Sequence, residues 1–284
     1  MFEFNESLEQ ARDRNIRDAL TEDIGVCDWT GQLVPVPNPV TAHLLVREEA
    51  VLCGRAWFEG CMRGVDPDLQ LEWHYEEGDL MAANTNVCHI RGEARSIFTA
   101  ERAALNFLQL LSGTATLTRR YVDAIAGVSE KGCAVLDTRK TIPGLRQAQK
   151  YAVRVGGGQN QRMALWHGIL IKENHIAAAG GIPQVLDNAR ALDAGVEIQI
   201  EVENMDQLQQ ALDSGATSVL LDNFTLQAMR DAVALTAGRA LLEASGGVQL
   251  ETMRDIAATG VDRISIGKLT KDVAATDYSL RIVG

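Results

Sequence analysis

The sequence lacks the features that mark membrane, secreted and nucleic-acid-binding proteins. No apolar run approaches the roughly 20 residues needed to span a bilayer, and the charged N-terminal segment has no apolar core of the kind found in signal peptides. Basic residues are outnumbered, which gives a formal net charge of −11 at pH 7. Neither a nucleic acid nor a membrane is therefore expected as a partner. We predict a soluble, cytoplasmic protein.

Cysteine and histidine are sparse and follow no metal-binding pattern. The five cysteines are odd in number and include no C-x-x-C pair. This usage indicates reduced thiols rather than a disulfide framework. The five histidines show no ligand spacing either, so a zinc site is not expected. The length of 284 residues suits two domains, one of them large enough for a barrel.

The second half of the chain alternates strand-length apolar runs with helical segments. The runs occupy residues 133–140, 169–175, 196–204, 218–223, 240–247 and 263–268. Such alternation predicts right-handed βαβ units and a parallel sheet. No G-x-G-x-x-G motif follows the first run, so a dinucleotide-binding sheet lacks its main support. Because every run ends in polar or glycine residues, we predict an α/β barrel whose strand ends share one mouth.

The first half has an α+β pattern and predicts a separate domain. The expected elements are a helix over 6–22, strands at 40–47, 50–53, 69–75 and 86–91, and a helix over 99–111. We predict a first domain over 1–113, with a tail at about 272–284 that packs on it, and a barrel domain over 114–271. On the last helix, Arg102 points away from the apolar face that carries Ala104. Arg102 is thus placed to meet solvent, another domain or another subunit.

Residues 137–172 concentrate positive charge. They contain seven basic residues and one acidic residue, Asp137, a local charge of +6. Three of the basic residues recur at steps of four and predict a solvated helix face: Arg146, Lys150 and Arg154. The other four follow strand runs or a glycine loop and would converge at a barrel mouth: Arg139, Lys140, Arg162 and Lys172. Converging guanidinium and ammonium groups recognise carboxylates or phosphates, so we expect an anionic substrate.

Glycine-rich segments and carboxylates also follow the predicted strands. Ser245-Gly246-Gly247 and Ile266-Gly267-Lys268 follow the last two runs, where barrels commonly bind a phosphate. Gly156-Gly157-Gly158 could let backbone N–H groups approach an anion, but a plain turn explains it as well. The carboxylates of Glu201, Glu203 and Asp222 could hold the lysines in place. They could equally hold a Mg²⁺ shared with substrate phosphates.

Three long motifs resemble the quinolinate phosphoribosyltransferase family: DTRKTIPGLR (137–146), KYAVRVGGGQNQR (150–162) and LIKENHI (170–176). The resemblance covers nearly the whole chain and extends to ERAALNFLQLLSG (101–113) and LEASGGV (242–248). It implies an N-terminal α/β sandwich followed by an open α/β barrel, in a homodimer or higher oligomer with shared active sites. It also implies transfer of phosphoribosyl from phosphoribosyl pyrophosphate to quinolinate with decarboxylation. The products would be nicotinate mononucleotide, pyrophosphate and CO2, in the biosynthesis of NAD.

The resemblance also implies roles for single residues. Arg139, Arg162 and Lys172 would hold the quinolinate carboxylates, with Arg102 reaching in from the partner subunit. The ribose and the Mg²⁺-pyrophosphate would be handled by Thr138 to Lys140 with Glu201 and Asp222, the latter two as metal ligands. The 5′-phosphate would bind at Ser245, Gly246 and Gly247 and at Ile266, Gly267 and Lys268. The catalytic group implied is Lys140, Lys172, Glu201 and Asp222.

One position departs from the family pattern. Many members have histidine where this chain has Gln161, which can donate a hydrogen bond but carries no charge. We therefore expect Gln161 to act in polar positioning and not as a proton donor. Two other readings stay open: a related enzyme for nicotinate or another anionic heterocycle, and a non-catalytic barrel that senses a phosphate ligand. Quinolinate-dependent CO2 release, compared with turnover of nicotinate, tests the first alternative. Absence of pyrophosphate release with both quinolinate and nicotinate would favour the second.

Overall fold

The chain folds into two compact units that both draw on separate stretches of sequence. The structure, a computed structural model, describes residues 6–283. The first unit runs up to Arg119 and also includes 141–157 and the chain from Leu269 onward, whereas the second contains 120–140 and 158–268. Within the described residues, no helix combines the length and apolar character needed to cross a membrane.

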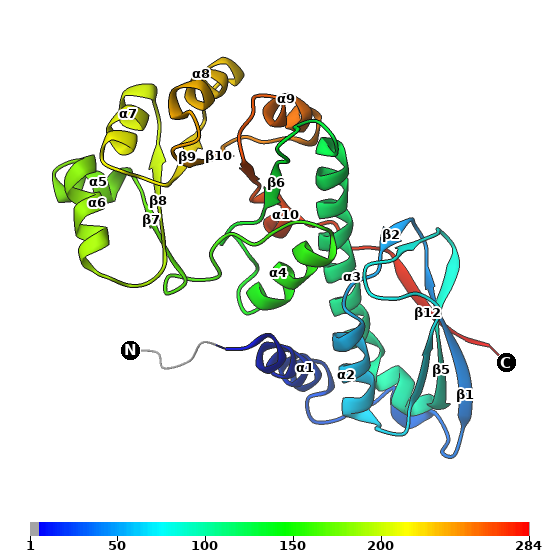
Figure 1. The fold of residues 1–284 in the computed structure, drawn as a ribbon. Helices are drawn as coiled ribbons and strands as arrows, with labels where there is room; N and C mark the ends of the chain where they lie inside the picture. The colour runs from blue at the N-terminus through cyan, green and yellow to red at the C-terminus, as the bar shows by residue number, and fades with distance from the viewer. Residues whose placement is uncertain (1–5, 284) are drawn as a thin grey trace. The chain divides into compact units, whose positions relative to one another are not determined.

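The first unit is built on a four-stranded antiparallel sheet in the order β12-β1-β5-β3. Its strands are β1 (Pro39–Val46), β3 (Gln70–Trp73), β5 (Thr85–Glu93) and β12 (Tyr278–Val283), with a small sheet of β2 (Ala50–Val51) and β4 (Leu80–Met81). Its helices are α1 (Leu8–Ile24), η1 (Gly31–Leu33), α2 (Arg55–Val65), the first part of α3 (Ala94–Ile125), and α4 (Arg146–Val155). In Figure 1, α2 and α3 lie along one side of this sheet.

Buried and exposed side chains alternate along β1, which shows which face of the sheet packs against the helices. Ala42, Leu44 and Val46 are fully buried in the core shared with α2 and α3. The intervening His43 points to the opposite face because side chains alternate along a strand. There it stacks on His89 of β5, with ring centroids 4.3 Å apart. One face of the sheet therefore forms the core and the other carries polar rings.

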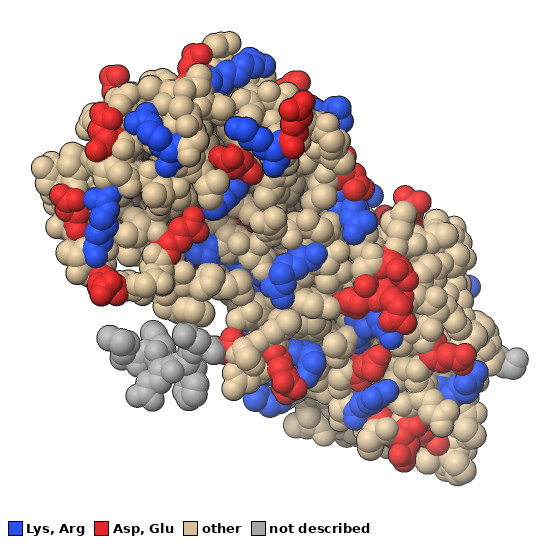
Figure 2. Space-filling model, viewed as in Figure 1, with Lys and Arg blue, Asp and Glu red and all other residues tan. Residues whose placement is uncertain are grey.

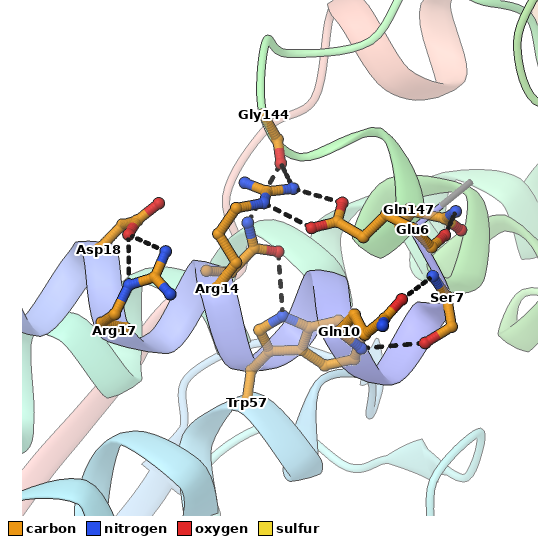
Figure 3. Close-up of polar contacts among 10 residues, drawn as sticks. Glu6, Ser7, Gln10, Arg14, Arg17, Asp18, Trp57, Gly144 and Gln147 are labelled. Carbon is orange, nitrogen blue, oxygen red and sulfur yellow. Dashed lines mark hydrogen bonds and ion pairs between the residues drawn. The ribbon is translucent and has the colours of Figure 1, made fainter. Parts of the chain in front are cut away.

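Polar contacts fix α1 against the segment that follows Lys140. Ser7 caps α1 through a capping box with Gln10. Asn15 Nδ2 donates to the carbonyl of Gly144 at 3.1 Å and Asn15 Oδ1 accepts from Trp57 Nε1 at 3.4 Å. Figure 3 shows the guanidinium of Arg14 beside Gly144, to whose carbonyl it also donates at 3.2 Å. The loop containing Gly144 is thus held by a buried amide.

The second unit is a six-stranded parallel sheet in the order β6-β11-β10-β9-β8-β7. Its strands are β6 (Ala134–Leu136), β7 (Gly168–Ile171), β8 (Glu197–Val202), β9 (Ser218–Asp222), β10 (Leu241–Ser245) and β11 (Arg263–Ser265). Helices follow the strands: α5 (Glu173–Ala179), α6 (Ile182–Ala191), α7 (Met205–Asp213), α8 (Leu226–Thr236), η2 (Leu250–Thr252) and α9 (Met253–Ala257). The short helix α10 (Lys268–Lys271) begins at the last residue of this unit, and its remaining residues belong to the first unit. All six predicted strand runs are observed, which confirms the predicted α/β class.

The sheet curls rather than lying flat. Arg263 Nη1 on β11 lies 3.2 Å from Glu197 Oε1 on β8, although β9 and β10 lie between these strands. In a flat sheet the same backbones would be roughly 14 Å apart at the usual strand spacing. The contact fits a barrel whose interior side chains meet. The barrel is open, because the edge strands β6 and β7 pair with no common neighbour and β6 contacts Gln159 only through an isolated bridge.

The prediction of a solvated basic helix face is wrong for one of its three members. Arg154 is exposed and Arg146 partly exposed, but Lys150 is fully buried within α4. The apolar face of α4 packs into the core through Ala148 and Ala152. A four-residue step keeps residues near one helix face, yet it does not say how wide the buried stripe is.

Candidate active site

The predicted site residues of the second unit lie at one edge of the parallel sheet, with the exception of Arg162, which precedes β7. Thr138, Arg139 and Lys140 follow β6, Lys172 follows β7, and Glu201 is the second-last residue of β8. Asp222 and Ser245 end the paired strands β9 and β10, directly opposite each other in register. Ile266, Gly267 and Lys268 follow β11. Since parallel strands end at the same edge, these groups surround a common mouth.

Three predicted cations line a single pocket, which we call the arginine pocket. Arg139, Arg162 and Lys172 contribute to its wall together with β7 and α6, and its volume is about 500 Å³. Arg162 Nη1 donates to the carbonyl of Gly168 at 2.9 Å. That bond directs the guanidinium toward the start of β7. The pocket therefore combines positive groups with the apolar wall that an aromatic anion needs.

The electrostatics of the arginine pocket favour an anion. Burial lowers the pKa of Arg162, and the neighbouring charge of Arg139 lowers it further. Arg162 Nε is buried and has no hydrogen-bond partner among the described residues. Two guanidinium groups side by side repel each other, and a buried donor without an acceptor is costly. A bound carboxylate would relieve both penalties.

Lys172 lines the arginine pocket and also pairs with a carboxylate. Its Nζ lies 2.9 Å from Glu201 Oε2. The Lys172 side chain is 46% exposed, but that of Glu201 only 11%. His175 Nδ1 accepts from the backbone N–H of Lys172 at 3.0 Å, so this histidine caps the start of α5.

A second group of residues lies around Lys140. Thr138 Oγ1 accepts from the Lys140 backbone N–H at 3.1 Å. Gly267 lies so close that an added methyl group would be 3.1 Å from Lys140 Cδ. Lys268 Nζ donates to Gln249 Oε1 at 2.6 Å. The structure thus brings the ends of β6 and β11 together around two lysines.

The loop after β10 is tightly packed. Gly246 adopts a φ of +95°, and a methyl group there would overlap Asn223 Oδ1. The Asn223 backbone N–H also donates to the Ser245 carbonyl at 3.0 Å. Asn223 was not singled out in the sequence. Its position directly after Asp222, at a strand end, could have identified it as a residue near the site.

The carboxylates fit a magnesium ion better than a transition metal. Glu201 and Asp222 lie at the ends of the adjacent strands β8 and β9, and Asp222 Oδ2 also accepts from Asn223 Nδ2 at 3.0 Å. Within the described part of the chain, no three histidine, cysteine or acidic side chains form a metal-binding group. Mg²⁺ typically takes one or two protein carboxylates together with substrate phosphates and water. This donor set matches that preference.

Two predicted features lie in the first unit. Arg102 is exposed on α3, as the helical pattern predicts. Gly156 is buried against α3, where an added methyl group would overlap the Ala115 carbonyl. Close packing therefore explains this glycine of the triple-glycine segment without an anion.

Family models match both parts of the chain. The N-terminal domain of quinolinate phosphoribosyl transferase matches residues 28–112 and its C-terminal domain matches residues 114–281. The chain belongs to the quinolinate phosphoribosyltransferase family. The predicted resemblance is thereby confirmed.

Relatives match along most of their length. A probable carboxylating nicotinate-nucleotide pyrophosphorylase of Bacillus subtilis is 37% identical, covering 92% of this chain and 90% of the relative. A decarboxylating quinolinate phosphoribosyltransferase of Nicotiana tabacum is 38% identical, covering 94% of this chain and 81% of the relative. The solved structure of the nicotinate-nucleotide pyrophosphorylase from Francisella tularensis has a TM-score of 0.92 at 42% identity, covering 98% of this chain and 97% of that one.

Proposed function

We propose that this protein transfers the phosphoribosyl group of phosphoribosyl pyrophosphate to quinolinate and releases CO2, forming nicotinate mononucleotide and pyrophosphate. The observation that carries the proposal is the arginine pocket, in which Arg139, Arg162 and Lys172 line one cavity. Three cations suit a small aromatic dicarboxylate, since arginine binds carboxylates through paired hydrogen bonds. Membership of the family and the names of its relatives support the same activity.

The phosphoribosyl donor binds around Lys140 and the glycine segments. Thr138 and Lys140 meet the pyrophosphate and ribose, while Ser245 to Gly247 and Ile266 to Lys268 receive the 5′-phosphate. The closeness of Lys140 to Gly267 supports this arrangement, because two loops that touch can contact neighbouring parts of one ligand. Backbone N–H groups at glycine turns are suited to phosphate oxygens.

Glu201 and Asp222 are the residues that would hold Mg²⁺ and the ribose hydroxyls. When bound, the metal would neutralise charge on the pyrophosphate. Lys172 pairs with Glu201, so this carboxylate would link the cation of the acceptor site to the metal site. Catalysis on this proposal depends on Lys140, Lys172, Glu201 and Asp222.

The chemistry needs positioning more than proton transfer. The pyridine nitrogen of quinolinate attacks the anomeric carbon while the bond to pyrophosphate breaks and the leaving group takes the electron pair. Lys140 stabilises the developing negative charge. The ring nitrogen is then positively charged, so the bond to the 2-carboxylate can break to release CO2, and the ring carbon takes a proton. No general base is required for the attack, which suits the uncharged Gln161.

Arg102 completes the acceptor site from a second copy of the chain. It is exposed on α3, and we propose a homodimer in which Arg102 of the partner subunit meets the quinolinate carboxylates. Mixing inactive Arg102→Ala with inactive Lys172→Ala protein should restore partial activity, because a mixed dimer holds one intact site. Mixed dimers that are proven to form yet remain inactive would contradict a shared site.

The primary test measures quinolinate-dependent and Mg²⁺-dependent CO2 release, with nicotinate as the competing acceptor. Turnover of nicotinate but not quinolinate would contradict the proposed substrate, and absence of pyrophosphate release with both would contradict enzymatic function. In the same assay, Arg139→Ala should weaken quinolinate binding by about 1.5–3 kcal/mol, the cost of losing a charged hydrogen bond. Arg63→Ala, a half-exposed arginine of α2, is the matched control.

A further inference from the structure

Three hydrogen-bonded polar side chains, two of them buried and one partly exposed, run through the interior of the second unit. Gln161 Nε2 donates to Gln199 Oε1 at 3.0 Å, and Gln199 Nε2 donates to Glu243 Oε2 at 2.8 Å. Gln199 is 3% exposed and Glu243 is 1% exposed. We call these three residues the polar file. It joins β8 and β10 to the loop that precedes β7.

The polar file is unusual for a barrel interior. Branched apolar side chains normally fill this space, and burial of a carboxylate is unfavourable unless hydrogen bonds compensate. Burial raises the pKa of Glu243, against the opposing effect of the bond from Gln199. Apolar side chains at these positions would avoid that cost. The file therefore calls for an explanation other than core packing.

The two hydrogen bonds of the file run in the same direction, toward Glu243. Carboxylate oxygens accept hydrogen bonds, and Gln199 donates its amide N–H to Glu243. Its carbonyl oxygen is then turned toward Gln161, which donates in turn. An acceptor oxygen at position 243 thus favours the orientation of the Gln161 amide in which Nε2 faces Gln199.

A second buried carboxylate holds the same segment. Asp137 is fully buried, and its Oδ2 accepts from Asn160 Nδ2 at 2.6 Å while its Oδ1 accepts from the Gln161 backbone N–H at 3.0 Å. Asp137 directly precedes the segment that carries Arg139. One carboxylate therefore ties the segment bearing Arg139 to the segment bearing Arg162.

These anchors matter because residues 160–162 belong to no helix or strand. The isolated bridge at Gln159 precedes them and β7 begins only at Gly168. Without a ladder of backbone hydrogen bonds, the place of Arg162 depends on side-chain anchors on either side of it. Arg162 lines the arginine pocket, so a shift of its backbone would displace one of the groups proposed to bind the anion.

We propose that Gln199 and Glu243 are positioning residues that, together with Asp137, hold residues 160–162 so that Arg162 meets a substrate carboxylate. This inference rests on the proposed function for the identity of the substrate. Neither residue contacts the substrate: both act through Gln161. The polar file thereby gives a role to the glutamine that stands where many family members have histidine.

The test compares Gln199→Met with the wild type. Methionine is unbranched and of similar length but makes neither hydrogen bond. We expect weaker quinolinate binding by calorimetry and a KM for quinolinate raised about 10- to 100-fold, the scale of a misplaced binding group. The KM for phosphoribosyl pyrophosphate should change little. Glu243→Gln keeps an acceptor oxygen and should retain near wild-type values.

Ser218→Ala is the matched control, since Ser218 is a buried polar residue of the neighbouring strand β9 outside the file. Unchanged quinolinate binding in Gln199→Met would overturn the positioning role. So would an equal loss for both substrates that follows a lowered melting temperature, because that is the mark of general destabilisation. If Gln199→Met fails to fold, Gln161→Met is the alternative variant. It removes the hydrogen bond at the partly exposed end of the file and should give the same selective loss of quinolinate binding.

The same measurements separate this inference from the proposed function. A wild type that binds quinolinate but releases no CO2 overturns the proposed reaction, while the binding comparison still decides the role of the file. A wild type that releases CO2 with an unaffected Gln199→Met variant overturns the file alone. A wild type that neither binds nor turns over quinolinate overturns both.

Discussion

Lys172 Nζ lies 2.9 Å from Glu201 Oε2, so the cation proposed for quinolinate and the carboxylate proposed for Mg²⁺ are paired with each other. The pair links the two halves of the proposed site. A substrate carboxylate that approaches Lys172 competes with Glu201, which frees the carboxylate for other ligands. Occupation of the acceptor site and of the metal site should therefore be coupled.

Substitutions on the two sides of this pair should have different effects. Lys172→Ala should weaken quinolinate binding by about 1.5–3 kcal/mol, the cost of losing a charged hydrogen bond. Its melting temperature should also fall, because Glu201, whose side chain is only 11% exposed, loses its ionic partner. Glu201→Gln should retain quinolinate binding in the absence of Mg²⁺ and lose turnover. Calorimetry and CO2 release measure the two effects.

Lys271→Ala provides the control for this comparison. Lys271 is also half-exposed and paired with a neighbouring acid, Asp272, but it lies outside the candidate site. It should leave binding and turnover unchanged. Equal loss of quinolinate binding in Lys172→Ala and Glu201→Gln would contradict the division of roles.

Alanine at Gly246 should be far more harmful than alanine at Gly247. Both glycines have positive φ, which costs an L-residue roughly 1–2 kcal/mol. Only Gly246 would also bring its methyl group into Asn223, whereas nothing lies within 4 Å of a methyl group at Gly247. Compared with Gly247→Ala, Gly246→Ala should have a lower free energy of unfolding in denaturant and a higher KM for phosphoribosyl pyrophosphate. Equal effects would mean that the collision with Asn223 is relieved without cost.

The stability of the first unit should fall in mild acid because of His89. Its ring lies between His43 and His74, with centroids 4.3 and 4.6 Å away. Desolvation lowers the pKa of His89 below its usual 6.5, and the charges of His43, His74 and Arg91 add to this, with Glu72 opposing. The unfolded chain then binds the proton more tightly than the folded chain does. Stability is present above about pH 6.5 and is lost as the pH falls through the folded pKa.

The variant His89→Gln should reduce this pH dependence. It removes the titrating ring while the strand remains paired with β1 and β3. The measurement is the free energy of unfolding between pH 5 and pH 8, compared with the wild type. Identical pH profiles for the two proteins would show that His89 does not contribute.

Asn15→Ala should destabilise the protein through a buried donor. The side chain is 5% exposed and bridges the Gly144 carbonyl and Trp57 Nε1. Its removal leaves Trp57 N–H without an acceptor, at a cost of about 1–3 kcal/mol. Arg17→Ala, which breaks only the exposed contact with Asp18, should cost roughly 0–1 kcal/mol. Chemical denaturation distinguishes the two.

The barrel and its mouth were predictable because they depend on local pattern. Short apolar runs that end in polar groups identify the parallel strands, and parallel strands place their ends together. Arg139 and Lys172 could be placed at one mouth on that basis alone. The mixed surface, with acidic and basic side chains interspersed in Figure 2, also follows from composition.

The anchors beneath the site were not predictable in the same way. Gln199 and Glu243 lie inside strands, each between apolar residues in the sequence. Their contact depends on the curvature of the sheet that brings β8 and β10 together. Lys150 was misjudged because helical spacing gives a direction around the helix but not the depth of packing. Such features depend on contacts between distant parts of the chain, which no local pattern contains.

The place of β12 beside β1 has a consequence for synthesis of the chain. These strands pair over six residues in register, yet the whole of the second unit lies between them in sequence. While the ribosome is still adding the second unit, β1 has a partner on only one side, β5. An open edge of this kind invites pairing with other chains. The nascent protein should therefore be most prone to self-association just before its final strand emerges.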